Sequence, residues 1–182
     1  KSNSDTETIL AGFQKFGSSF FKKLNGIFSL AIYHTEEKKI TLARDHFGVK
    51  PLYYYYKGGQ FIFSSEIKAL LKIPELDRTV DYNSIRNYIH YMYSPGNKTP
   101  LLYFKKFPSG NFLEIDLNKK LEKLTFKKYY EIPFDGRYKI NSEKEAIKKI
   151  DYQLREAIKK QLLSDVPIGY FLSGGLDSSL IV

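Results

Sequence analysis

The chain has 182 residues, of which 42% are hydrophobic and 16% are aromatic, so it is long and apolar enough to bury a core and is not typical of a disordered protein. No run of about eighteen apolar residues occurs, which argues against a membrane-spanning helix. The sequence contains no cysteine, which excludes disulfides within it and fits a reducing compartment, the cytoplasm in the simplest case.

The net charge of +9 raises the question of a nucleic-acid partner. The basic residues are mostly lysines scattered over turns and helix faces, often as doublets such as Lys148-Lys149, and such doublets usually solvate a surface. The aromatic run Tyr53 to Tyr56 is explained by β propensity and core packing. We therefore expect no nucleic-acid partner. We also expect no metal site, because the histidines lack ligand spacing. They are His34, His46 and His90.

The first two thirds of the chain are predicted to be rich in strands. Ser4 and Glu7 form a plausible S-x-x-E capping box at the start of a helix over residues 5–16. Gly58-Gly59 predicts the turn of a β-hairpin. The apolar and aromatic runs predict strands near 27–33, 40–44, 52–56, 61–64, 101–107, 111–117 and 123–130, and helices near 65–72 and 82–91. Antiparallel sheets covered by helices, an α+β class, follow from this order.

One segment in this part carries charges beside a turn. Arg44 and Asp45 are expected to form a buried ion pair that fixes the loop after them, and Gly48 and Pro51 are expected to shape the turn into the next strand. We expect these residues to be structural and not catalytic.

The last third is predicted to begin a second domain. Residues 131–141 include Pro133, Asp135 and Gly136 and are typical of a linker. Ser142 and Glu145 form a second plausible capping box, followed by a long amphipathic helix. The apolar run from Val166 to Leu172 then predicts a buried strand that ends in a glycine turn, after which another helix begins.

That turn, Ser173-Gly174-Gly175-Leu176-Asp177-Ser178-Ser179, is the main candidate functional feature. Adjacent glycines let the backbone approach an anion closely, and the serine hydroxyls add donors, so we expect a phosphate in a crevice at the strand's tip. No lysine lies between Asp165 and Val182, which disfavours an ordinary P-loop kinase or GTPase. From the residues alone, a plain strand-to-helix turn capped by Asp177 or Ser178 is an equally good interpretation.

Five ordered segments resemble one family. Residues 173–179 resemble the PP-loop of the ATP pyrophosphatase superfamily, and residues 163–169 are similar to the lead-in found in glutamine-hydrolysing asparagine synthetases. Residues 44–54, 63–70 and 105–113 resemble successive segments of the class II glutamine amidotransferase domain in the same family. Together these segments extend over nearly the whole chain.

The resemblance implies a truncated four-layer α/β/β/α sandwich of the Ntn-hydrolase type over residues 1–130, a linker over 131–141, and the start of a Rossmann-like, ATP-binding PP-loop domain over 142–182. Such amidotransferases use an N-terminal cysteine, which this chain lacks, so it contains no catalytic residue and is interpreted as an inactive internal piece of a longer enzyme. The segment Ser4 to Leu10 resembles the one whose aspartate holds the α-amino group of glutamine, which maps onto Asp5. From the residues alone, a place in the first turn of a capped helix is the favoured role for Asp5.

For the intact protein, the resemblance implies that ammonia from glutamine is joined to aspartate, activated by ATP as a β-aspartyl adenylate, with Mg²⁺ neutralising the phosphates. The residues that match the ATP site are Phe171, Ser173, Gly174, Gly175, Asp177 and Ser178. A homodimer of the intact protein is a further expectation. The alternatives are a relative that amidates another carboxylate in glycan or peptide tailoring, a tRNA-modifying PP-loop protein, and a non-catalytic interaction module.

Overall fold

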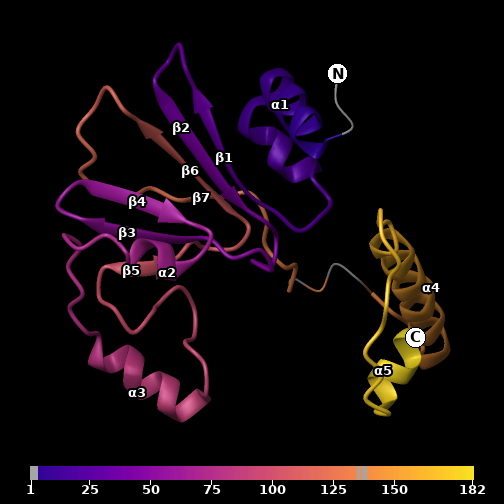
Figure 1. Ribbon diagram of the computed structural model, residues 1–182. Coiled ribbons are helices and arrows are strands. Elements are labelled where there is room, and N and C mark those ends of the chain that lie inside the picture. Colours follow the sequence, from indigo (N-terminus) through magenta and orange to yellow (C-terminus); the bar gives the residue numbers. More distant parts are fainter. Residues whose placement is uncertain (1–3, 135, 137–138) are drawn as a thin grey trace. The chain divides into compact units, whose positions relative to one another are not determined.

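The computed structural model of the protein describes residues 4–134, 136 and 139–182; Asp135 of the predicted linker lies outside them. The chain divides into two compact units, Lys1–Ile132 and Pro133–Val182, which are described separately below (Figure 1). The first unit carries antiparallel sheets together with helices, so the predicted α+β class is confirmed. No helix in the part of the chain that the structure describes is long and apolar enough to span a bilayer.

Four antiparallel strands form the first sheet of unit 1, in the order β1-β2-β6-β7 (Figure 1). Their bounds are Ser29–His34 for β1, Lys39–Arg44 for β2, Asn111–Asp116 for β6 and Lys127–Lys128 for β7. The central pair places Leu42 of β2 opposite Leu113 of β6. The strand predicted over 123–130 is wrong except for β7, because Leu124 and Phe126 pack against the core from an irregular segment.

Three strands form the second sheet, in the order β4-β3-β5. Their bounds are Tyr53–Lys57 for β3, Gln60–Ser64 for β4 and Phe104–Lys106 for β5. The hairpin predicted at Gly58-Gly59 is confirmed, since the two glycines join β3 to β4 and both have positive φ angles, 59° and 84°. The strand predicted over 101–107 is shorter than expected, because Leu101 instead forms an isolated bridge with Val80.

The two-residue period of the strands divides the core into layers. Leu42, Leu113 and Ile115 of the first sheet face Tyr54 of the second and Phe107, which directly follows β5, so the sheets pack against each other. The outer face of the first sheet packs against residues of the helical segment before β1. The outer face of the second sheet packs against residues of the segment after β4. The first outer cluster contains Phe13, Phe20, Phe21, Ile32, Ala43, Phe112 and Tyr129; the second contains Tyr55, Leu70, Leu76 and Phe104. The layer order is therefore helix, sheet, sheet, helix.

The tyrosine run shows how this alternation works. Tyr54 and Tyr56 contribute to the cluster between the sheets, whereas Tyr53 and Tyr55 contribute to the cluster beneath the second sheet. The explanation of this run by core packing is confirmed, because all four rings lie in hydrophobic clusters.

The helices of unit 1 come before β1 and after the β3–β4 hairpin in the chain. Helix α1, Asp5–Phe16, has the predicted bounds, and the Ser4 hydroxyl caps it by accepting from the Thr6 amide at 3.2 Å. The 3-10 helix η1, Gly17–Lys23, follows directly. Helix α2, Ile67–Leu70, is shorter than the predicted 65–72, and α3, Tyr82–Tyr91, matches its predicted range. Asp81 caps α3 by accepting from the Ser84 amide at 3.1 Å.

A surface carboxylate before α3 predicts a measurable pH dependence. Asp77 binds the Lys57 ammonium and also accepts from the Thr79 amide at 2.8 Å, and these bonds lower the pKa of Asp77 from 3.8 to about 2. A carboxyl with a lowered folded pKa stabilises the fold above its unfolded pKa, and this contribution is lost as the pH falls from about 4 toward 2. We expect Asp77→Asn to lower Tm slightly at pH 7.

The decisive measurement is the difference in Tm between wild type and variant as a function of pH. This difference should shrink through the window from pH 4 to pH 2, while Glu122→Gln, at an exposed position, should show no such trend. A constant Tm difference from pH 7 to pH 2 would contradict the assignment.

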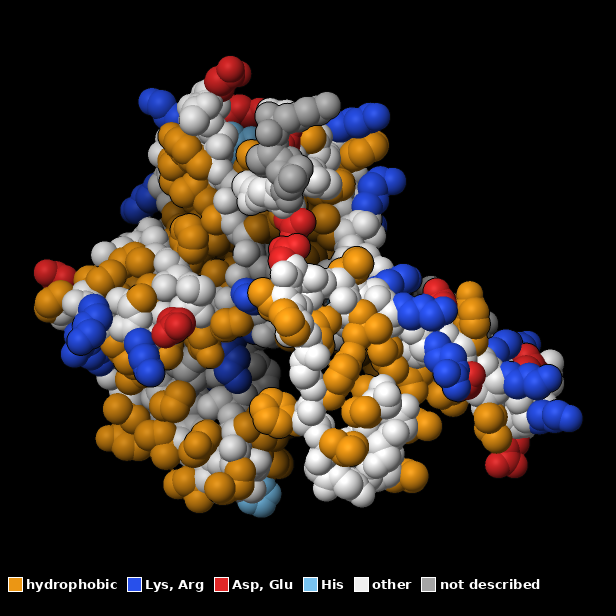
Figure 2. All heavy atoms as spheres, turned by 45° about the vertical axis from the view of Figure 1, so that its right-hand side comes forward, with side chains coloured by type: hydrophobic (Ala, Val, Ile, Leu, Met, Phe, Trp, Pro, Cys, Tyr) orange, Lys and Arg blue, Asp and Glu red, His pale blue; other side chains and the backbone are white. Residues whose placement is uncertain are grey.

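Unit 2 contains two described helices, α4 (Glu143–Gln161) and α5 (Leu176–Ile181). The Ser142 hydroxyl caps α4 as predicted by accepting from the Glu145 amide at 3.2 Å. The Glu145 carboxylate accepts from the Asn141 amide at 3.1 Å. In a standard capping box it would accept from the amide of the N-cap residue itself, Ser142. No described residue of this unit is buried, and many hydrophobic side chains lie at the protein surface (Figure 2).

The buried strand predicted over Val166–Leu172 is wrong. These residues are exposed and have no regular secondary structure. The physical reason is that a strand needs a neighbour with which to exchange backbone hydrogen bonds, and the described part of residues 133–182 contains no other strand.

Candidate functional site

The loop after β2 is organised around a buried carboxylate. Asp45 is only 2% exposed, and its side chain accepts from three backbone amides. The donors are Phe47 at 3.1 Å, Val49 at 3.0 Å and Lys50 at 2.9 Å. A carboxylate that accepts several amide bonds offsets its own burial, so Asp45 holds the loop in one conformation.

Arg44 fixes the same loop from the other side. Its guanidinium donates to the carbonyls of Lys50 at 2.8 Å, Gly48 at 2.6 Å and Phe107 at 2.6 Å. Burial lowers the pKa of Arg44, with the charge of Asp45 opposing that shift. The predicted Arg44–Asp45 ion pair is wrong, because among the described contacts both charged groups bind backbone atoms and not each other. The structural role expected for both residues is confirmed.

Gly110 joins this loop to the end of the domain. Its amide donates to the Asp45 carbonyl at 2.9 Å, and its own carbonyl accepts from the amides of Tyr129 and Tyr130. Gly110 has a φ of 62°, and a Cβ there would lie 2.8 Å from the Tyr130 carbonyl oxygen, so only glycine fits.

Tyr129 completes this network, and sequence reasoning missed it. Its hydroxyl donates to the Arg44 carbonyl at 2.6 Å, and burial together with the nearby charge of Asp45 raises its pKa. No signal in the sequence could have linked Tyr129 to Arg44, which lies 85 residues earlier.

Asp5, the candidate glutamine ligand, is the first residue of α1 and is exposed. Its side chain forms no hydrogen bond or ion pair with any described residue, so its carboxylate is available to a ligand ammonium. Its place in the first turn also suits the helix dipole, as the alternative interpretation held.

The candidate ATP loop is a compact turn before α5. The hydroxyls of Ser173 and Ser178 lie 2.9 Å apart, and Ser178 also donates to the Gly175 carbonyl at 3.0 Å. Gly174 has a φ of 77°, and a Cβ placed there would meet no atom within 4 Å, so an anion has open access to this backbone. The first-turn amides of α5, from Leu176 to Ser178, have no carbonyl partner within the helix and are free to donate.

The expected crevice is not formed by the described residues. Phe171 is fully exposed, and residues 171–177 all lie at the surface. In an open parallel sheet, the crevice forms between the carboxyl ends of neighbouring strands, and unit 2 has no strand in its described part. The structure therefore brings together Ser173, Gly174, Gly175, Asp177 and Ser178 in one turn but does not enclose them.

The described residues contain no group of three or more His, Cys, Asp or Glu side chains that could hold a metal ion. His46 instead packs its ring against Tyr130, with ring centroids 4.5 Å apart, and against Tyr129 at 5.5 Å.

Comparison with known protein families shows to which family the chain is related. Residues 1–130 match the family profile described as "Glutamine amidotransferase domain". The chain belongs to this family. Within this amidotransferase chain, residues 149–182 match a second profile, described as "Asparagine synthase". The predicted resemblance to glutamine-hydrolysing asparagine synthetases is therefore confirmed.

Individual relatives of this amidotransferase chain agree with the family matches. It is 35% identical to a putative asparagine synthetase [glutamine-hydrolyzing] 2 of Methanocaldococcus jannaschii, covering 100% of this chain and 35% of that protein. It is 32% identical to asparagine synthetase [glutamine-hydrolyzing] 1 of Bacillus subtilis, covering 99% of this chain and 28% of the relative. It is 31% identical to asparagine synthetase B of Escherichia coli, covering 100% of this chain and 27% of the relative. The amidotransferase chain thus spans between about a quarter and a third of the length of these enzymes.

Proposed function

We propose that this chain is part of a glutamine-hydrolysing asparagine synthetase. The observation that carries the proposal is the order of the two profile matches, the amidotransferase profile over 1–130 and the asparagine synthase profile over 149–182. We assign residues 1–130 to the ammonia-releasing domain, 131–141 to a linker and 142–182 to the start of the ATP-binding domain. The division of the chain into units at Ile132 and Pro133 supports this assignment.

The layers of unit 1 support an Ntn-hydrolase type of sandwich. Two antiparallel sheets face each other, and helical residues pack on the outer face of each. We propose that this unit is the part of such a sandwich that lies after the nucleophile segment, since the chain contains no cysteine to act as nucleophile.

In the proposed glutamine site, Asp5 binds the α-ammonium group of glutamine. Its exposed position and its lack of a bonding partner among the described residues favour this role. A carboxylate that orients the substrate in this way contributes to binding glutamine and not to any other substrate of the enzyme.

In the proposed nucleotide site, Ser173, Gly174, Gly175, Asp177 and Ser178 hold the phosphates of ATP, and Phe171 lies beside the adenine. The open space at Gly174 and the unpartnered amides of α5 fit an anion. When bound to ATP, Mg²⁺ would neutralise phosphate charge, and Asp177 is the one carboxylate of the turn that can face it.

The proposed reaction consumes ATP, aspartate, glutamine and water. The aspartate β-carboxylate attacks the α-phosphorus of ATP and releases pyrophosphate, which leaves a β-aspartyl adenylate. Hydrolysis of the glutamine amide yields glutamate and ammonia. Ammonia then attacks the adenylate and forms asparagine and AMP. Exclusion of water protects the adenylate until ammonia arrives.

The test measures pyrophosphate release by the full-length protein with ATP, aspartate and either glutamine or ammonium chloride. We expect release to require aspartate. Asp5→Asn should weaken the glutamine-dependent reaction about tenfold or more through KM and leave the ammonium-dependent reaction unchanged. Asp177→Asn should weaken both reactions.

The matched controls are Glu7→Gln for Asp5 and Asp165→Asn for Asp177, since each lies close by in sequence but outside the proposed site. Both controls should behave like wild type. Pyrophosphate release that depends on other acids but never on aspartate would reject asparagine synthesis and favour a relative that amidates another carboxylate.

A further inference from the structure

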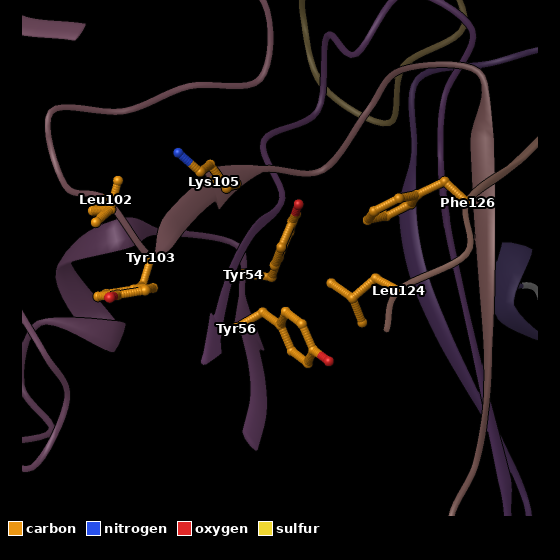
Figure 3. Close-up of a pocket in the computed structure, with 7 residues that line it drawn as sticks. All are labelled: Tyr54, Tyr56, Leu102, Tyr103, Lys105, Leu124 and Phe126. Atoms are coloured by element: carbon orange, nitrogen blue, oxygen red, sulfur yellow. The ribbon is translucent and has the colours of Figure 1, made fainter. Parts of the chain in front are cut away.

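A cavity of about 330 Å³ lies in unit 1 beside strands β3 and β5 (Figure 3). Tyr54 and Tyr56 of β3 lie at its centre, Tyr103 and Lys105 line it from β5 and the residue before it, and Leu124 and Phe126 line it from the irregular segment before β7 (Figure 3). None of these residues belongs to the proposed glutamine or nucleotide sites. The volume lies at the lower end of the range of small-molecule sites, about 300–1,000 Å³.

The aromatic wall of this cavity is held in place by the core. The Tyr54 ring packs against Phe126 at 5.6 Å between ring centroids and against Phe107 at 6.4 Å. The Tyr56 hydroxyl donates to the Leu121 carbonyl at 3.2 Å, which attaches the irregular segment to β3. The cavity is therefore largely preformed, and little ordering is needed when a ligand enters.

Lys105 places one positive charge at this apolar wall. It lies directly across from Tyr54 in the β3–β5 ladder, so the two side chains share the face of the sheet that points toward the cavity. Lys105 is half-buried, and burial lowers its pKa, with the charge of Lys98 adding to that shift and that of Asp81 opposing it.

Two polar groups at the cavity, those of Lys105 and Tyr54, have no bonded partner among the described side chains. The Lys105 ammonium forms no ion pair or hydrogen bond with any described residue, and the Tyr54 hydroxyl forms no hydrogen bond with any of them. A half-buried ammonium that contacts no anion directly is costly, and a bound carboxylate would relieve that cost.

We propose that this cavity binds a small molecule that carries one aromatic ring and one carboxylate. The ring stacks among Tyr54, Tyr56 and Phe126, and the carboxylate accepts from the Lys105 ammonium and the Tyr54 hydroxyl. The aromatic side chains account for the preference for a ring, and the single unpaired ammonium accounts for the preference for an acid.

The test titrates the full chain with phenylacetate and with phenylacetamide, followed by amide and methyl chemical shifts in NMR spectra. Phenylacetamide is the matched ligand, because it has the same shape but no charge. We expect phenylacetate to shift the signals of residues that line the cavity and to bind at least about tenfold more tightly than phenylacetamide.

Lys105→Met keeps the apolar stem and removes the charge, so it should reduce phenylacetate affinity about tenfold, to the level of the amide. Lys123→Met is the matched control at an exposed lysine outside the lining and should leave the affinity unchanged. Leu124→Trp should fill the cavity and abolish binding of both ligands; Leu102→Trp, at a position 40% exposed, does the same with less risk to folding.

Equal affinity for the two ligands would overturn the proposal. So would an equal loss in Lys105→Met and Lys123→Met, or unchanged phenylacetate binding in a folded Leu102→Trp protein. Shifts confined to residues outside the lining would also overturn it.

Discussion

Replacing Asp45 with asparagine is expected to destabilise unit 1 by about 2–4 kcal/mol. The Asp45 carboxylate is buried and accepts from three amides through both of its oxygens. An asparagine amide has one accepting oxygen, and its NH₂ group would face the amide that now donates to the second carboxylate oxygen. At least one backbone donor that now bonds to this buried carboxylate would then be left without an acceptor.

Urea unfolding followed by tyrosine fluorescence and circular dichroism measures this change in the free energy of unfolding. Asp116→Asn is the matched control, because the Asp116 side chain is partly exposed and accepts from the Asn118 amide at the surface, and it should change the free energy much less. If the free energy of unfolding of Asp45→Asn lies within about 0.5 kcal/mol of the wild-type value, the loop does not depend on this carboxylate.

The two units are expected to differ by more than about a hundredfold in hydrogen exchange. Amides in the centre of the first sheet, such as those of Leu42 and Leu113, belong to residues that are at most 1% exposed, and they should exchange only on global unfolding. Helix α4 lies in a unit without a buried described residue, and its Ile147 and Ile150 side chains are 60% and 61% exposed. Its amides are expected to exchange by local fraying.

Exchange followed by mass spectrometry on the full chain at constant pH compares peptides from β2, β6 and α4. Helix α3 is the internal control for a helix of unit 1 that includes a buried residue, Ser84. Protection in α4 equal to that in β2 would contradict the prediction and would show that unit 2 is stabilised by contacts that its own residues do not provide.

Local signals in the sequence predicted much of unit 1 correctly. The bounds of α1 follow from its capping residue, those of α3 from its apolar and aromatic residues, and the β3–β4 hairpin from Gly58-Gly59. These features depend on residues within a few positions of each other, so a single sequence contains them.

Features that depend on distant partners were predicted poorly. The apolar run Val166–Leu172 has the composition of a strand, but strand formation needs a neighbour that the described part of unit 2 does not contain. Arg44 was expected to pair with Asp45 and instead donates to the Phe107 carbonyl, 63 residues away. A backbone carbonyl carries no mark in the sequence, so this partner could not be inferred.

The candidate site residues stay predictions. Family resemblance proposed Asp5 and the turn from Ser173 to Ser178, and the geometry supplies an available carboxylate and an open turn. The cavity beside Lys105 left no trace in the sequence, because Tyr54 and Lys105 meet only through the β3–β5 register.

The hydrogen bonds at Gly110 determine how far a gene fragment encoding the amidotransferase domain must extend. Gly110 bonds to the carbonyl of Asp45, directly after β2, and to the amides of Tyr129 and Tyr130. Tyr130 is therefore the last residue of a hydrogen-bond network that begins at the end of β2. A fragment that stops after β6 would leave the Gly110 carbonyl and the Arg44 carbonyl without these donors. The smallest expression unit for this domain therefore includes Tyr130.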